Sequence, residues 1–212
     1  MSKLIQYVNL SKQWKSERKE LLKIIDKTLA NSSWIGGDEI ITFENNIKKL
    51  CGTKFCCALN SGTDALVLSL KLVGVKKGDE VITPPNSFIA STSVIDHIGA
   101  IPKFVDVLDD QNINPDLIRK AITKKTKAIM PVHLTGRLCK MDEINKISKE
   151  YNIPVIEDSA QSIGSKFNNK MSGSFGKVGC FSAHPLKNLN AMGDGGYLTT
   201  NDKKIYDRIK DL

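Results

Sequence analysis

The chain has 212 residues, enough for one large domain or two small ones, with 41% hydrophobic and 25% charged residues, as in ordinary globular proteins. No stretch approaches the roughly 18 apolar residues of a membrane span. Charged residues follow the N-terminus so closely that no apolar segment of a signal peptide fits there. We therefore expect a cytoplasmic protein without a membrane partner. The net charge of +8 comes from scattered lysines, and aromatic residues make up only 6%, so no nucleic-acid partner is expected.

The five cysteines are an odd number and show no metal-ligand spacing. Cys56 and Cys57 are adjacent within an apolar run, which is typical of reduced thiols in a core. We expect neither a disulfide framework nor a bound metal.

Short apolar runs alternate with helical patterns along most of the chain. Two helices are predicted first, at 11–31 and 38–50. The predicted strands are 55–59, 80–83, 101–107, 126–132, 153–157, 178–181 and 196–199. Between and after them, helices are predicted at 63–73, 87–98, 115–122, 142–151 and from about Asp202 onward. Because the strands are almost entirely apolar, both faces of the sheet should be covered, and the βα rhythm predicts an α/β fold with a mainly parallel sheet.

The organisation changes at both ends of this pattern. Residues 1–33 are predicted to form an N-terminal helical segment, and residues 34–212 a large domain. Residues 159–177 are rich in Ser, Gly and Asn and are predicted to form a loop. The sequence stops inside a helical pattern with no terminating Gly or Pro, which predicts part of a longer polypeptide.

The first candidate site follows the first predicted strand, at Ser61-Gly62-Thr63. A glycine and two hydroxyl residues at the start of a helix offer backbone N–H groups, side-chain donors and the positive end of the helix dipole. This arrangement is suited to a phosphate. The alternative is an ordinary capped helix, with Ser61 or Thr63 as the cap.

The second candidate site is Glu157-Asp158, at the end of an apolar strand. Ligands of open parallel sheets bind beyond the carboxyl ends of the strands. An acid in such a crevice needs a positive partner: a protonated pyridine nitrogen, a basic side chain or a metal ion. The alternative is a salt bridge that closes the strand.

The third candidate site is the segment 181–196, where Lys187 lies among Pro, Leu and several Gly residues. These neighbours are suited to a tight loop close to a ligand. A lysine held there can lose its proton and react with an aldehyde. The alternative is a glycine-rich turn with a solvated lysine.

Taken in this order, the three segments resemble the DegT/DnrJ-type family of nucleotide-sugar aminotransferases, which are fold-type-I enzymes that use pyridoxal 5′-phosphate. Residues 83–88 and 131–134 resemble further family segments, and the similarity runs from about Trp34 to Asp202. The resemblance implies a three-layer α/β sandwich like the large domain of aspartate aminotransferase. Members of the family continue into a smaller C-terminal domain, which we expect this chain to lack.

The resemblance also implies roles for single residues. Lys187 would bind the cofactor aldehyde and shuttle a proton, and Asp158 would pair with the pyridine nitrogen. Phe88 would stack on the ring, and Gln161 would lie near its phenolic oxygen. The remaining implied cofactor contacts are Ser61, Gly62, Thr63, Ser182 and Asn188, and the implied substrate contacts are Trp34, Ile35 and His184.

The implied reaction is transfer of an amino group, from glutamate, to a keto-sugar on a nucleoside diphosphate, for amino-sugar and cell-surface polysaccharide biosynthesis. The implied assembly is a homodimer. Related dehydratases place a histidine where transaminases place the lysine, so Lys187 favours transamination. Two alternatives are another fold-type-I pyridoxal phosphate enzyme and a truncated chain without turnover of its own.

Overall fold

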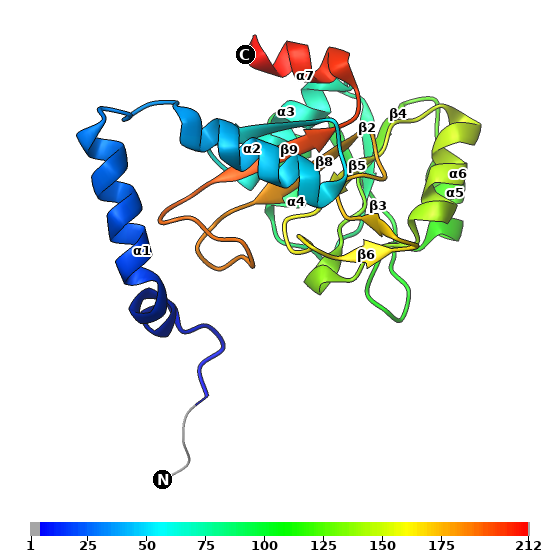
Figure 1. Cartoon of the computed structure of the whole chain (residues 1–212). Coiled ribbons are helices and arrows are strands. Elements are labelled where there is room, and N and C mark those ends of the chain that lie inside the picture. The colour runs from blue at the N-terminus through cyan, green and yellow to red at the C-terminus, as the bar shows by residue number, and fades with distance from the viewer. Residues whose placement is uncertain (1–4, 212) are drawn as a thin grey trace. The chain divides into compact units, whose positions relative to one another are not determined.

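The computed structural model of the protein describes residues 5–211, which form two compact units, one up to Phe43 and one from Glu44 onward (Figure 1). The first unit contains α1 (Leu10–Ala30) and the beginning of α2 (Asp38–Cys51). The side chain of Asn9 caps α1 by accepting the N–H of Lys12 at 2.8 Å. Within residues 5–211, no helix is both long and apolar enough to cross a membrane. The domain boundary predicted between residues 33 and 34 stays a prediction.

The second unit is built around a mainly parallel sheet. Its strands are β1 (Phe55–Leu59), β2 (Glu80–Thr83), β3 (Ile101–Phe104), β4 (Thr126–Ile129), β5 (Ile156–Asp158), β8 (Val178–Ser182) and β9 (Gly196–Thr200). They form the rows β3-β2-β4 and β5-β8-β9-β1, and parallel bridges Ile129–Val155 and Val132–Asp158 join the two rows. Only β9 runs antiparallel to its neighbours.

Helices cover both faces of this sheet. One core cluster contains residues of α3 (Gly62–Leu72), α4 (Ala90–His97) and α7 (Lys203–Lys210). The other contains residues of α5 (Pro115–Ala121) and α6 (Met141–Tyr151), which lie together in Figure 1. Consecutive strand residues alternate between the clusters, as the strand period of two requires. The three-layer α/β sandwich predicted from the sequence is confirmed. The five cysteines are buried, and among them Cys56 and Cys57 lie in the core as predicted.

The structure differs from the predicted elements in several places. The strands predicted at 101–107, 126–132 and 153–157 are shorter, as β3, β4 and β5, and the helix predicted at 87–98 begins at Ala90. The predicted loop 159–177 contains a small hairpin, β6 (Lys166–Phe167) and β7 (Lys170–Met171). Its turn is Asn168-Asn169, both with positive φ, a conformation that asparagine tolerates in two-residue hairpins. A further difference is the exposure of β3, an edge strand whose Ile101 and Phe104 are 47% and 51% exposed. The prediction that other elements cover both faces of every strand is wrong for β3.

Glu157 anchors the segment that follows β7. Its carboxylate is fully buried and accepts the backbone N–H groups of Gly173 at 2.9 Å, Phe175 at 2.7 Å and Gly176 at 2.6 Å. A buried carboxylate requires several such donors to offset its lost hydration. Glu157 therefore ties this loop to β5.

A buried histidine completes the surroundings of Glu157. The Nε2 of His133 lies 3.0 Å from the Glu157 carboxylate, and its Nδ1 accepts the N–H of Cys139 at 3.2 Å. Because Nδ1 is an acceptor, the ring proton is assigned to Nε2, which donates to Glu157. Glu157 is thus held by backbone donors and a neutral histidine rather than by the salt bridge that was the alternative interpretation of the acidic pair.

We expect Glu157→Gln to lower the free energy of unfolding by about 3 kcal/mol, because the new amide group would face two donors. Equilibrium unfolding in urea measures the change. Glu150→Gln, which removes a charge from the exposed pair with Arg119, is the control and should have little effect. Equal stability of Glu157→Gln and the unchanged protein would contradict the anchoring role.

Candidate active site

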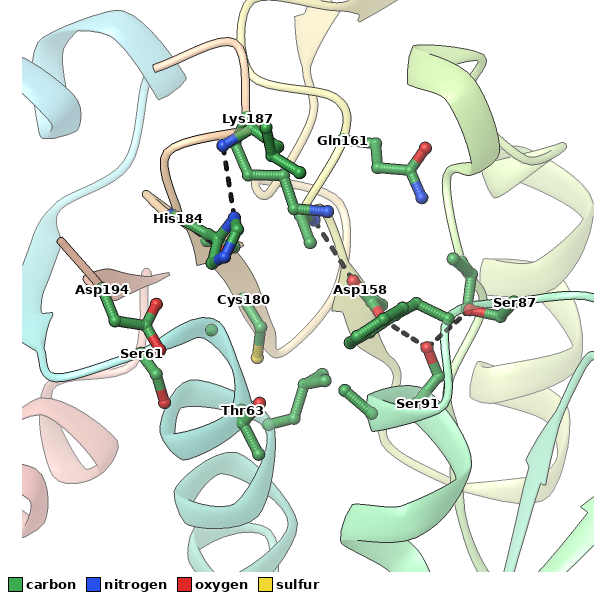
Figure 2. Close-up of a pocket in the computed structure, with 18 residues that line it drawn as sticks. Ser61, Thr63, Ser87, Ser91, Asp158, Gln161, Cys180, His184, Lys187 and Asp194 are labelled. Atoms are coloured by element: carbon green, nitrogen blue, oxygen red, sulfur yellow. Dashed lines mark hydrogen bonds between the residues drawn. The ribbon is translucent and has the colours of Figure 1, made fainter. Parts of the chain in front are cut away.

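A cavity of about 390 Å³ lies where the three predicted sites meet, in the second compact unit. This volume is within the usual range for a small-molecule site. Figure 2 shows residues from the start of α3, the end of β5 and the loop after β8 converging on it. The polar lining residues are Ser61, Thr63, Ser87, Ser91, Asp158, Gln161, Ser182, His184, Lys187 and Asp194.

Two hydroxyl groups at this cavity are oriented by backbone donors. Ser61 is the N-cap of α3, and its Oγ accepts the N–H of Asp64 at 3.0 Å. The Oγ of Ser182 accepts the N–H of His184 at 3.2 Å. Each hydroxyl keeps its own proton to donate, and the first N–H groups of α3 have no partner within the helix. Ser61 can therefore cap the helix and still donate its hydroxyl proton to an anion, so the two alternatives from the sequence do not exclude each other.

Two glycines allow the start of α3 to lie directly against β8 and β9. A Cβ on Gly196 would lie 2.2 Å from the backbone C and O atoms of Ser61. A Cβ on Gly62 would lie 2.7 Å from the Cβ of Ser182. Neither contact leaves room for a side chain on the glycine. The two glycines therefore fix the position of the turn and the direction of the N–H groups at the start of α3.

A tight turn holds Lys187 over the cavity. The N–H of Lys187 donates to the carbonyl of His184 at 2.8 Å, and the N–H of Leu186 donates to Nδ1 of the same histidine at 3.2 Å. The side chain of Lys187 extends into the cavity toward Asp158 (Figure 2), with Nζ 6.0 Å from the ring centre of Phe88. The amine, the aromatic ring and the carboxylate thus share one space.

Asp158 is buried at the bottom of the cavity. Its Oδ2 accepts the hydroxyl of Ser91 at 2.7 Å, and its Oδ1 accepts the N–H of Ala160 at 3.2 Å. Burial raises the pKa of the Asp158 carboxyl, whereas these two hydrogen bonds and the charge of Lys187 lower it. A positively charged group in the cavity would relieve the cost of burying this carboxylate.

The side chain of Gln161 is oriented by a strained turn. Its Oε1 accepts the N–H of Thr135 at 3.1 Å. Thr135 has a φ of 54°, in the left-handed region, within η1 (Leu134–Gly136). Because the amide oxygen is occupied, Gln161 offers its amide nitrogen, a donor, to the cavity that it lines.

The model of the DegT/DnrJ/EryC1/StrS aminotransferase family matches residues 15–212. The chain belongs to this family. It is 37% identical to the UDP-2-acetamido-2-deoxy-3-oxo-D-glucuronate aminotransferase of Pseudomonas aeruginosa, over 99% of this chain and 58% of that protein. The chain therefore spans little more than half the length of this relative.

Solved structures of similar proteins share the fold. DesV of S. venezuelae superposes with a TM-score of 0.96 at 33% identity, over all of this chain and 57% of that one. NtdA from Bacillus subtilis, solved with bound cofactor PMP, superposes with a TM-score of 0.85 at 32% identity, over 90% of this chain and 43% of that one. Both likenesses agree with membership of the DegT/DnrJ/EryC1/StrS family.

The structure brings together most of the residues that the family resemblance singled out. All the predicted cofactor contacts line the cavity except Asn188, whose side chain is exposed outside it. Among the predicted substrate contacts, His184 lines the cavity. Trp34 and Ile35 belong to the other compact unit and are 72% and 98% exposed. The roles assigned to these residues stay predictions.

Three polar lining residues were not predicted: Ser87, Ser91 and Asp194. The spacing of Ser87 and Ser91 by four positions, around Phe88, is a signal that could have identified them, because such residues share one face of a helical turn. Asp194 lies between Gly193 and Gly195, and its Oδ1 accepts the N–H of Gly195.

We expect Gly196→Ala to push β9 away from the Ser61-Gly62 turn, with a loss of about 1–3 kcal/mol in the free energy of unfolding. We also expect inorganic phosphate to raise the midpoint of thermal unfolding of the unchanged chain but not that of Gly196→Ala. Gly195→Ala is the matched control, because its Cβ would meet atoms no nearer than 3.3 Å. Equal protection by phosphate in both variants would show that the turn does not hold the anion.

Proposed function

We propose that this chain binds pyridoxal 5′-phosphate through Lys187 and serves an enzyme that transfers an amino group to a keto-sugar on a nucleoside diphosphate. The observation that carries the proposal is the shared cavity, in which a lysine amine faces a buried carboxylate beside a helix N-terminus. Family membership and the PMP bound to the similar NtdA agree with it. The proposal assigns cofactor binding to residues 34–212.

The cavity fits this cofactor in charge and shape. Asp158 is a buried acceptor for a positively charged ring nitrogen, and the lack of a Cβ at Gly62 and Gly196 makes room for the turn that would hold the phosphate. Ser61 and Ser182 offer hydroxyl donors beside that turn. Phe88, 67% exposed, offers a free ring face within the cavity.

When bound, pyridoxal phosphate supplies an aldehyde that accepts amino groups and a protonated ring that draws electrons from the reacting carbon. Lys187 would hold the aldehyde and afterwards move a proton at its Nζ. Asp158 would keep the positive charge on the ring nitrogen. Gln161, with its amide nitrogen available, would donate to the phenolic oxygen.

The substrate side of the proposal rests on the relatives. The P. aeruginosa relative is named for a 3-oxo sugar carried by UDP, which is the class of acceptor proposed for this protein. His184 is the cavity residue proposed to contact the sugar, and Trp34 and Ile35 are proposed as further contacts. Glutamate is the proposed donor, amino-sugar and cell-surface polysaccharide biosynthesis the proposed setting, and a homodimer the proposed assembly.

We expect Lys187→Ala to abolish covalent attachment of the cofactor while leaving the unfolding curve nearly unchanged. The chain is incubated with pyridoxal phosphate, reduced with borohydride and digested, and the modified peptide is identified by mass spectrometry. Lys120→Ala, an exposed lysine on α5, is the control and should keep the adduct. An undiminished adduct in Lys187→Ala would show that another lysine binds the cofactor.

We expect Asp158→Asn to bind the cofactor at least about tenfold more weakly. The reason is that the amide loses the attraction that a carboxylate exerts on a positively charged ring nitrogen at close range. Borohydride should still fix the cofactor that remains bound, because Lys187 is intact. Absorbance titration of the variant and the unchanged chain measures the two affinities. Equal affinities would remove Asp158 from the site as the charge partner.

A chain that holds the cofactor without turnover of its own is a second candidate, since this chain spans 58% of the P. aeruginosa relative. An assay with glutamate and a keto-sugar nucleotide separates the two candidates. Amino-sugar formation supports the full reaction in this chain, whereas an adduct without product supports cofactor binding alone.

A further inference from the structure

Two serines stand in series behind the Asp158 carboxylate. The Oγ of Ser91 lies 2.7 Å from Asp158 Oδ2, and the Oγ atoms of Ser91 and Ser87 lie 2.6 Å apart (Figure 2). Ser91 is 1% exposed, whereas Ser87 is partly exposed and, like Ser91, lines the cavity. The series therefore runs from the cavity wall to the buried carboxylate.

The direction of these hydrogen bonds follows from the number of protons. A hydroxyl group has one proton, and Ser91 donates it to Asp158. Ser91 must then accept the proton of Ser87. Both hydroxyls are thus aligned toward the carboxylate, and each hydrogen bond polarises the next. Such a chain favours an acceptor that carries negative charge.

The same turn also carries the proposed stacking residue. Ser87 and Ser91 are four positions apart and flank Phe88 in sequence, and the N–H of Ser91 donates to the carbonyl of Phe88 at 3.1 Å. The ring face and the two hydroxyls therefore have fixed positions relative to each other. A shift of this turn would move both.

The charged and titratable groups around Asp158 come from several elements. Lys187 favours its ionised form, and the charge of Asp158 adds to burial in raising the pKa of the Cys180 thiol on the neighbouring β8. Glu157 precedes it on β5 but is bound to His133 and to backbone donors on the other face. Ser91 is the uncharged side chain that donates directly to the Asp158 carboxylate.

We propose that Ser91, supported by Ser87, is a positioning residue that holds the Asp158 carboxylate ionised and aligned to receive the positively charged ring nitrogen of the cofactor. This inference rests on the proposed function for the identity of the cofactor. The coupling of Ser91 to Asp158 is a property of the protein alone, so it can be measured without the cofactor.

The first experiment measures unfolding of the cofactor-free chain as a function of pH. Burial raises the Asp158 pKa above its unfolded value, so ionisation costs stability as pH rises, and the Ser91 hydrogen bond offsets part of this cost. Ser91→Ala should therefore reduce the folding equilibrium constant little at acidic pH, where Asp158 is protonated, and about tenfold more at neutral pH.

Two comparisons make this result specific. In an Asp158→Asn background, Ser91→Ala should lose the pH-dependent part of its effect. Ser93→Ala, a serine on the same helix whose hydroxyl lies 3.5 Å from the Ala90 carbonyl, should show no such pH dependence in either background. An effect of Ser91→Ala that is the same at every pH would mean a purely structural role and would overturn the proposal.

The second experiment uses pyridoxal phosphate labelled with ¹⁵N at the ring nitrogen, whose chemical shift reports its protonation. In Ser91→Ala, the ring nitrogen should lose its proton at a lower pH, with about tenfold weaker proton binding, while Ser93→Ala should match the unchanged chain. An identical titration in Ser91→Ala would overturn the proposal. Failure of the unchanged chain to take up the label would instead overturn the proposed function, and the unfolding data would still decide the coupling of Ser91 to Asp158.

Discussion

Two consecutive carboxylates at the end of β5 must satisfy opposite requirements, and the alternation of a β-strand allows it. Glu157 faces the layer that contains α5 and α6, where three backbone donors and His133 surround it. Asp158 faces the layer that contains α3 and α4, where it reaches the cavity. A shift of one residue would exchange them, placing a fully bound acid in the cavity and a cavity acid in the core.

This arrangement separates the fixed charge from the functional one. Glu157 accepts four hydrogen bonds from groups that belong to the fold, so little of its capacity remains for a ligand. Asp158 accepts two and keeps part of its capacity for a cation. The loop held by Glu157 leads directly into β8, and β8 leads to Lys187. The first acid therefore helps to place the amine that faces the second.

The sequence was sufficient to predict the strands and the convergence of three polar segments, because apolar runs and strand ends determine both. The residue pattern alone could not distinguish Glu157 from Asp158, since their difference depends on which face each occupies, and only the family resemblance singled out Asp158. The family resemblance implied Asn188 as a cofactor contact, but its side chain is exposed and does not line the cavity. The spacing of Ser91 from Ser87 could have placed both on one face of a helical turn, but it gives no sign of the acid that Ser91 contacts, which lies 67 residues away.

The cavity derives its chemistry from contacts that are distant in sequence and close in space. Gly196 admits the backbone of Ser61, Ser91 contacts Asp158, and Thr135 orients Gln161. None of these three supporting residues would itself react with a ligand. They leave the hydroxyl proton of Ser61, part of the acceptor capacity of Asp158 and the amide nitrogen of Gln161 available to a ligand in the cavity. The groups that would contact a cofactor are thus oriented before it binds. Binding therefore costs less conformational entropy than it would if these side chains had to be ordered by the ligand. These contacts join α3, α4 and η1 to the sheet and the loop after β5, so motif matches within a single segment do not reveal them.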